Sequence, residues 1–255
     1  MPDEDLAWRC EQACANAWPG VRQVLIGDWV QRIGAGLTRR ANALHPLVPA
    51  AEGLASALPR AEALCRGQGL PLLVRLPSLL GPEAERLLER RGFAAEGETL
   101  TLLGALPAEP AADPQAVCSP GFPSGWLAAQ AALQGYDPAR AAAFRAIVGQ
   151  IALPLASVAL RIEGGSRAQA FGVLDGGLLC IEAVIVAPAF RRQGLARRCL
   201  RALFAWAAAR GGEAACLQVQ ADNAPAIALY RGLGLRRELY RYHYRRAPAG
   251  ETPAR

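Results

Sequence analysis

A turn that could bind phosphate follows an apolar strand in the second half of the sequence. The strand, Leu178 to Val186, leads into Arg191-Arg192-Gln193-Gly194-Leu195-Ala196. A helix starting at Leu195 would present unpaired main-chain N–H groups and about half a positive charge, which together bind anions. Gly194 and Ala196 let an anion approach the backbone, and three arginines add charge for a diphosphate: Arg191, Arg192 and Arg197. The alternative is an ordinary loop with surface arginines.

Two better-known phosphate-binding loops do not fit this turn. A nucleotide-hydrolase loop needs Gly-Lys-Ser/Thr, and the sequence contains no lysine. A dinucleotide-binding loop needs three glycines in close spacing, which the turn lacks. Nucleotide hydrolysis and hydride transfer therefore lose support.

Composition narrows the class of protein further. The 255 residues are 52% hydrophobic and 20% charged, the balance of a globular protein, and no apolar run reaches the length of a membrane span. The N-terminus is acidic where a signal peptide would be basic, so we expect a cytoplasmic protein without membrane association. The net charge of +6 comes from arginine without an interleaved aromatic pattern, and we expect no nucleic-acid partner.

The seven cysteines include no Cys-x-x-Cys pair. Cys10 and Cys14 have the spacing of one helix face, and the two histidines, His45 and His243, lie far apart in the sequence. We expect reduced, buried thiols that pack as small apolar side chains, and no metal site.

The elements that must position the turn fall into two segments. Prolines and glycines between 107 and 124 predict a linker, and the polar residues 247–255 predict a disordered tail. In the first segment, hydrophobic spacing and turn residues predict the following elements: a helix over 6–18, two extended runs around Gly34-Ala35-Gly36, a helix near 59–66, a strand over 71–76, a helix over 82–91 and a strand over 98–106.

The second segment predicts helices first and a sheet afterwards. Two helices over 126–133 and 138–151 precede three antiparallel strands that end at Val186. A helix over 195–210, a strand over 215–220, a helix over 224–233 and a strand over 235–245 then alternate. In the last strand, Tyr240, Tyr242 and Tyr244 share one face, and Arg241, His243 and Arg245 share the other.

These residues carry a resemblance over 125–246. Its motifs are Val186-x-Pro188, Arg191-x-x-Gly194-x-Ala196, the run from Asn223 to Tyr230, and Leu233-Gly234. In this order they resemble the GNAT N-acetyltransferase superfamily. The first half, 1–106, resembles the degenerate leading domain of tandem GNAT-like bacterial proteins through Ala17-Trp18-Pro19, Asp28-Trp29 and Gly36-x-Thr38-Arg39-Arg40-Ala41-Asn42. The expected fold class is α/β (α+β): two tandem domains with a mixed, largely antiparallel sheet flanked by helices.

The resemblance implies acetyl-CoA as the acyl donor. Its pyrophosphate would lie on the turn from Arg191 to Arg197, and its pantetheine amides would pair with the strand edge formed by Val184, Ile185 and Val186, where neighbouring strands splay. A main-chain N–H near Val186 would polarise the thioester carbonyl. Asn223 would contact the pantetheine arm, although a helix N-cap alone explains an asparagine there.

The resemblance also implies a general acid. Relatives use a tyrosine at the position of Tyr230, and a phenol with a pKa near 10 can give a proton to a leaving thiolate; packing under the last strand is the alternative. For the base we select Glu182, which interrupts an apolar strand and would either face the splayed cleft or pair with an arginine. Some relatives carry a glutamate where this sequence has Gln218. Because glutamine cannot accept a proton at neutral pH, Glu182 or a chain of water molecules is left as the base.

Aligning Gly92 with Gly234 compares the two halves. Leu88 then replaces Tyr230, and Gly81 replaces Asn223. No Arg-x-x-Gly-x-Ala turn precedes the first-half helix, so we expect that half to be structural or to shape the substrate site. We expect one active site per chain that transfers an acetyl group to a small-molecule or peptide amine. A non-catalytic acyl-CoA sensor or scaffold is the alternative, and the sequence indicates no oligomeric state.

Overall fold

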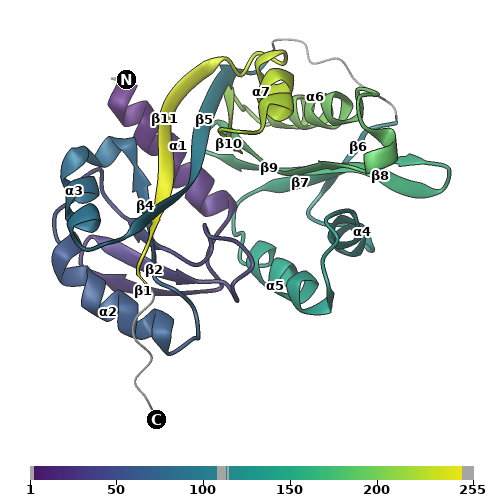
Figure 1. Cartoon of the computed structure of the whole chain (residues 1–255). Coiled ribbons are helices and arrows are strands. Elements are labelled where there is room, and N and C mark those ends of the chain that lie inside the picture. Colours follow the sequence, from purple (N-terminus) through teal and green to yellow (C-terminus); the bar gives the residue numbers. More distant parts are fainter. Residues whose placement is uncertain (1–2, 108–112, 114, 249–255) are drawn as a thin grey trace.

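The protein folds around a single mixed sheet. The structure, a computed structural model, describes residues 3–107, 113 and 115–248. Within them, eleven strands form one sheet in the order β1-β2-β3-β4-β11-β5-β10-β9-β8-β7-β6 (Figure 1). The strand pairs are antiparallel except β3 with β4 and β9 with β10. The predicted α+β class with a mixed, largely antiparallel sheet is confirmed.

The second half follows the predicted order closely. Pro138 at the first helical position and the Asp137 side chain, which accepts from the Arg140 N–H, start its second helix. The elements are α4 (Trp126–Leu133), α5 (Pro138–Val148), β7 (Leu155–Ile162), β8 (Gly165–Asp175), β9 (Leu178–Val186), the 3₁₀ turn η2 (Pro188–Phe190), α6 (Leu195–Ala208), β10 (Ala214–Gln220), α7 (Ala224–Arg231) and β11 (Arg237–Arg246).

The first half departs from the prediction in two places. Its elements are α1 (Asp3–Ala17), β1 (Arg22–Ile26), β2 (Trp29–Ile33), β3 (Leu44–Pro46), α2 (Leu54–Arg66), β4 (Leu73–Pro77), the 3₁₀ turn η1 (Ser78–Leu80), α3 (Pro82–Arg90) and β5 (Ala94–Ala105). The hairpin turns at Gly27-Asp28, because Gly27 takes a positive φ of 59° and Ile26 pairs with Trp29. The sequence pattern missed this hairpin. The expected turn at 34–36 is present, because Leu37 donates its N–H to the Gly34 oxygen and the strands on either side, β2 and β3, pair antiparallel.

Residues 34–43 form a loop that Asn42 holds in place. The Asn42 side-chain oxygen accepts hydrogen bonds from the N–H groups of Gly34 and Gly36, at 2.8 and 3.0 Å. Helix α2 begins at Leu54 rather than near Pro59, which lies inside the helix. The sequence pattern missed this start because a proline usually marks the first turn of a helix.

The linker and tail predictions fall partly outside the described residues. Within the predicted linker 107–124, residues 117–120 form β6, which pairs antiparallel with β7 and completes the sheet edge. Residues 108–112 and 114 lie outside the described part of the chain, as do residues 249–255 of the predicted tail. Ala247, the first tail residue, donates its N–H to Leu72 at 3.0 Å.

The two halves exchange their last strands. Strand β5 of the first half pairs with β10 of the second half, whereas β11 of the second half pairs with β4 of the first half. The exchanged strands also pair with each other, from Arg237 opposite Leu103 to Arg246 opposite Ala94. Figure 1 shows β5 and β11 crossing the centre of the molecule side by side. The sheet is therefore continuous across both halves.

Helices cover both faces of this sheet. One core cluster packs α6 and α7 on strands β5 and β7–β10, and a second packs α1, α4 and α5 on the opposite face. A third cluster lies between α2, α3 and strands β2–β4. As predicted, Tyr240, Tyr242 and Tyr244 face the same core, while Arg245 and His243 on the other face bond Glu85 of α3. No described helix is long and apolar enough to cross a bilayer.

Candidate active site

The predicted phosphate-binding turn adjoins a cavity at the start of α6. Gly194 caps the helix at φ 78°, and no side chain of the described residues caps it by a hydrogen bond. Arg192 also has a positive φ of 65°. The cavity has a volume of about 380 Å³, and its lining includes most of the predicted turn: Val186, Phe190, Arg191, Arg192, Gly194, Leu195, Ala196, Arg197, Pro225, Ala228 and Leu229. The N-terminus of α6 thus contributes to an arginine-rich cavity that suits an anion.

The arginines around the turn have different local partners. Arg197 donates to the main-chain oxygen of Gly232 at the end of α7, and the Arg191 Nε donates to that of Val186. Arg198 instead forms an ion pair with Asp113, which directs its charge away from the turn. Gln193 donates to the Ala189 oxygen and does not line the cavity. The positive charge available to a ligand therefore comes from Arg191, Arg192 and Arg197.

Strands β9 and β10 separate beside this cavity. Their parallel pairing runs from Leu178 opposite Ala214 to Cys180 opposite Cys216 and ends there. Beyond it, β9 continues through Glu182 to Val186, and β10 continues to Gln220. The resemblance implied such a splay. Val184 and Val186 pack toward the α6 face, and Ile185 stays paired with Gln169 of β8.

A β-bulge on β9 lies in the splayed region, and no residue pattern in the sequence indicates it. Glu182 pairs with Phe171 and Ile185 with Gln169, so Ala183 and Val184 together face one residue of β8. Ala183 adopts a positive φ of 52°, a conformation that alanine rarely takes, and its carbonyl accepts from the Gln130 side chain at 2.8 Å. Backbone strain of this kind concentrates at functional sites.

Tyr230 lies on α7, packed against the α6 core. Its side chain is 8% exposed, and no hydrogen bond to its hydroxyl occurs within the described residues. Burial and, to a smaller extent, the negative charge of Glu182 raise the pKa of the phenol to about 12. Tyr230 is thus protonated at neutral pH and electrostatically close to Glu182. Asn223 caps the same helix, accepting from the Ala226 N–H at 3.2 Å.

Glu182 is held by an arginine of the first half. Arg40 donates to both Glu182 oxygens, at 2.9 and 2.7 Å, and to the Gln218 side-chain oxygen at 3.1 Å. Of the two expected environments, facing the cleft or pairing with an arginine, Glu182 has the second. Its pKa lies above the ordinary value, because burial outweighs the opposing charge of Arg40. Arg40 therefore bridges the splayed strands β9 and β10.

Sequence reasoning did not select Arg40 as a site residue. Its position is set by the loop that Asn42 fixes, by the Trp18 ring 5.0 Å from its guanidinium, and by a hydrogen bond that its carbonyl accepts from His45. The run Thr38-Arg39-Arg40-Ala41-Asn42, which carried the resemblance of the first half, was the available signal.

A buried polar network extends from Gln218 toward α1. The Gln218 side-chain nitrogen donates to Glu11 and to the Tyr240 hydroxyl, and Tyr240 donates to Glu11 at 2.5 Å. Arg75 of β4 donates to both Glu11 oxygens, at 2.6 and 2.7 Å. Burial alone would raise the pKa of Glu11, but the charge and hydrogen bonds of Arg75 hold it below its ordinary value. Both halves thus contribute to the polar core beside the splay.

Comparisons with known proteins show the family and the fold of the chain. A profile of the family described as "Probable histone acetyltransferase Rv0428c C-terminal" matches residues 8–245. The uncharacterized N-acetyltransferase YobR of Bacillus subtilis (strain 168) is 24% identical, over 93% of this chain and 97% of its own length. A GCN5-related N-acetyltransferase from Kribbella flavida superposes with a TM-score of 0.70 at 18% identity, covering 98% of this chain and 96% of that one.

A tandem GNAT protein from the clavulanic acid biosynthesis pathway has a similar fold. Its TM-score is 0.63 at 14% identity, and the match covers 79% of this chain and 71% of that one. At this identity the similarity concerns the fold alone.

Proposed function

The chain belongs to the family described as "Probable histone acetyltransferase Rv0428c C-terminal", within the GNAT N-acetyltransferase superfamily, and we propose that it transfers an acetyl group from acetyl-CoA to an amine. The observation that carries the proposal is the convergence of three features on one end of β9. These are the arginine-rich cavity at the α6 N-terminus, the splay between β9 and β10, and the buried, protonated Tyr230.

Acetyl-CoA would enter along the splay. Its pyrophosphate would lie in the cavity at Gly194, against Arg191, Arg192 and Arg197. Its pantetheine amides would pair with the edge of β9 from Val184 to Val186, in the place of strand partners that β10 leaves unused. Asn223 would contact the same arm from the start of α7. The positive charge and the open strand edge support this placement.

The reaction needs one acid and one base. The amine nitrogen attacks the thioester carbonyl carbon, a main-chain N–H near the β9 bulge stabilises the developing oxyanion, and the carbon–sulfur bond breaks. Tyr230 gives its proton to the leaving CoA thiolate, which its raised pKa keeps available at neutral pH. The attacking amine gives up its proton to a base.

We propose Glu182 as that base. Burial raises the proton affinity of its carboxylate, and Arg40 orients both of its oxygens. Tyr230 is close enough for the Glu182 charge to raise its pKa, which supports placing acid and base at one site. The first half, in which Leu88 occupies the position of Tyr230, would be a degenerate GNAT-like unit that supplies Arg40 to the site.

A thiol-release screen tests the proposal. The full-length chain is mixed with acetyl-CoA and a panel of small amines, amine-bearing antibiotics and peptides, including lysine-containing histone peptides because of the family's description. We expect CoA release that depends on one amine class. Glu182→Gln should lower kcat and should remove the rise of kcat with pH that deprotonation of a base produces. Glu213→Gln, an exposed control, should leave both kcat and its pH dependence unchanged.

A non-catalytic acyl-CoA sensor is the second candidate, favoured by one contact. Arg40 occupies both oxygens of Glu182 and so competes with any proton that Glu182 would accept. If calorimetry shows that acetyl-CoA binds but no amine raises CoA release, the sensor is correct and the transferase proposal fails.

A further inference from the structure

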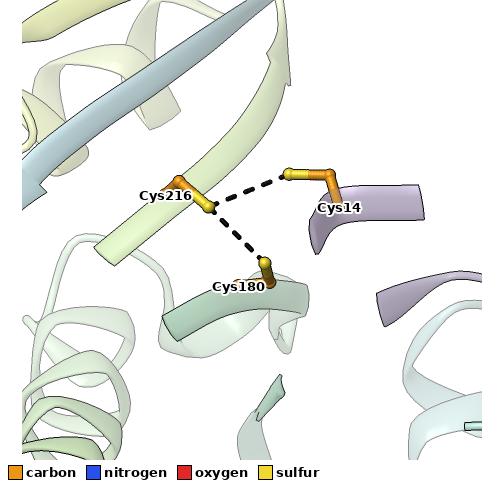
Figure 2. A group of neighbouring side chains, drawn as sticks. All are labelled: Cys14, Cys180 and Cys216. Atoms are coloured by element: carbon orange, nitrogen blue, oxygen red, sulfur yellow. Dashed lines mark hydrogen bonds between the residues drawn. The ribbon is translucent and has the colours of Figure 1, made fainter. Parts of the chain in front are cut away.

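Three buried cysteines meet where β9 and β10 begin to separate. Cys14 comes from α1, Cys180 from β9 and Cys216 from β10 (Figure 2). The Cys216 sulfur lies 3.9 Å from that of Cys14 and 3.5 Å from that of Cys180, and all three sulfurs lie within 4.8 Å of one another. None of the three side chains is more than 1% exposed. The cluster thus joins elements from both halves of the chain.

The spacing of the sulfurs matches that of metal ligands. A metal–sulfur distance of about 2.3 Å places the sulfurs of a tetrahedral or trigonal site about 3.8 to 4.0 Å apart. The separations of the Cys216 sulfur from the other two lie within a few tenths of an ångström of these values. Side-chain rotation alone could therefore close the three sulfurs around one ion, without a change in the strand register that fixes Cys180 opposite Cys216.

A fourth thiol lies next to the cluster. Cys10 precedes Cys14 by one helical turn, on the same face of α1, and is fully buried in the same core. The spacing Cys10-x-x-x-Cys14 is within the range that zinc-binding cysteine pairs use.

The charges around the cluster favour thiolates over neutral thiols. Beside the cluster, Arg75 pairs with Glu11 and Arg40 pairs with Glu182, and a third arginine, Arg32, is buried near them. Arg32 donates instead to the main-chain oxygens of Ala15 and Trp18, so one positive charge has no carboxylate partner there. Thiolates at the cluster would balance it.

We propose that Cys14, Cys180 and Cys216 bind one soft d¹⁰ metal ion, Cu(I) or Zn(II), that ties α1 to β9 and β10. Each ligating thiol releases its proton as a metal–sulfur bond forms, and no oxidation or reduction takes place. Soft thiolates select these ions over harder ones. Cu(I) suits the three sulfurs alone, whereas Zn(II) takes four ligands and would recruit Cys10. The ion would enter before α1 docks, since the docked helix buries the cluster.

Metal content and a cobalt spectrum test the site. The full chain is refolded under reducing conditions with Zn(II), with Cu(I) or with Co(II) as a spectroscopic substitute, and is then dialysed against a chelator. We expect about one retained ion per chain, release of protons on binding, and sulfur-to-cobalt charge-transfer absorption. Cys216→Ser should lower metal affinity at least about tenfold, and Cys65→Ser and Cys199→Ser, the matched buried controls, should retain it.

Cys10→Ser separates the two ions. Loss of the ion in this variant indicates four sulfurs and Zn(II), and retention indicates three sulfurs and Cu(I); both results support the site. If Cys216→Ser does not fold, the wild-type cobalt spectrum and a rise in Tm with the ion bound decide the question. Wild-type protein that retains no ion after refolding, with all seven thiols titratable once unfolded, overturns the proposal.

Discussion

The two halves build the same arrangement around different side chains. In each, a short helix follows the strand that receives the exchanged partner: α3 follows β4, and α7 follows β10. Gly81 is the N-cap of α3 where Asn223 is the N-cap of α7, as the alignment of the two sequences predicted. Leu88 is fully buried where Tyr230 retains 8% exposure. The two halves thus share this helix placement, while the proposed acid lies in the second half.

The difference shows how a half without an active site of its own can supply side chains to the site of the other half. The first half contributes Arg40 and Glu11 to the polar network at the splay of the second half. In the opposite direction, Arg245 of the exchanged strand β11 pairs with Glu85 of the first half. Substitutions at matched positions therefore test whether the second half supplies the reacting groups and the first half positions them.

The largest effect should come from removing the proposed acid. Tyr230→Phe should lower kcat about 10²- to 10³-fold with little change in acetyl-CoA affinity, because the phenol acts only as the thiolate leaves. Steady-state CoA release and calorimetry measure the two quantities. Tyr136→Phe, at a half-buried tyrosine between α4 and α5, is the control. An unchanged kcat would remove Tyr230 from the mechanism.

Breaking the contact between the halves should have the next largest effect. Arg40→Ala leaves the buried Glu182 carboxylate without its partner and should lower the free energy of unfolding by about 3 kcal/mol. Arg39→Ala, at a more exposed arginine 3.7 Å from Glu96, should cost less than about 1 kcal/mol. Denaturant unfolding measures both.

A double variant distinguishes positioning from stability. Arg40→Met with Glu182→Gln removes both charges and should recover most of the stability without recovering transfer. If Arg40→Ala keeps full activity and shows an unchanged pH profile of kcat, the first half does not position the base.

A moderate effect should follow from the turn that the first half lacks. Replacing Arg191 and Arg192 together by alanine should raise KM for acetyl-CoA about tenfold and leave kcat nearly unchanged, because the charges bind the donor before and during reaction. The rise should shrink at high salt, where the wild-type advantage is screened. Arg201→Ala, at an exposed arginine of α6, is the control, and an equal rise there would contradict the site.

The smallest effect should concern the acid limb of the stability profile, which is the pH range in which the free energy of unfolding falls as the pH falls. The folded pKa of Glu11 is lowered, so its ion pair with Arg75 stabilises the fold above the unfolded pKa of about 4.3, and this stability is lost as pH falls through the folded pKa. Glu11→Gln should flatten that limb in urea titrations between pH 3 and 7. Glu4→Gln, exposed on the same helix, should leave the limb steep.

Local patterns predicted most of the second half and little of the contact between halves. The turn before α6, the N-cap at Asn223 and the alternation in β11 are readable because each depends on neighbours within a few residues. The bond from Arg40 to Glu182 spans 142 residues and that from Cys14 to Cys216 spans 202, and no local periodicity encodes such partners. The bulge at Ala183 escaped notice because no glycine marks it.

The exchange of β5 and β11 also orders the events of protein synthesis. Strand β5 leaves the ribosome more than a hundred residues before its partner β10, and β4 waits for β11, which ends at Arg246. The first half therefore emerges with an incomplete sheet and exposed strand edges, a state prone to aggregation. Contacts this distant in sequence form slowly. Fold completion must await the synthesis of β11, and a chain truncated before Arg237 would leave both halves unfinished.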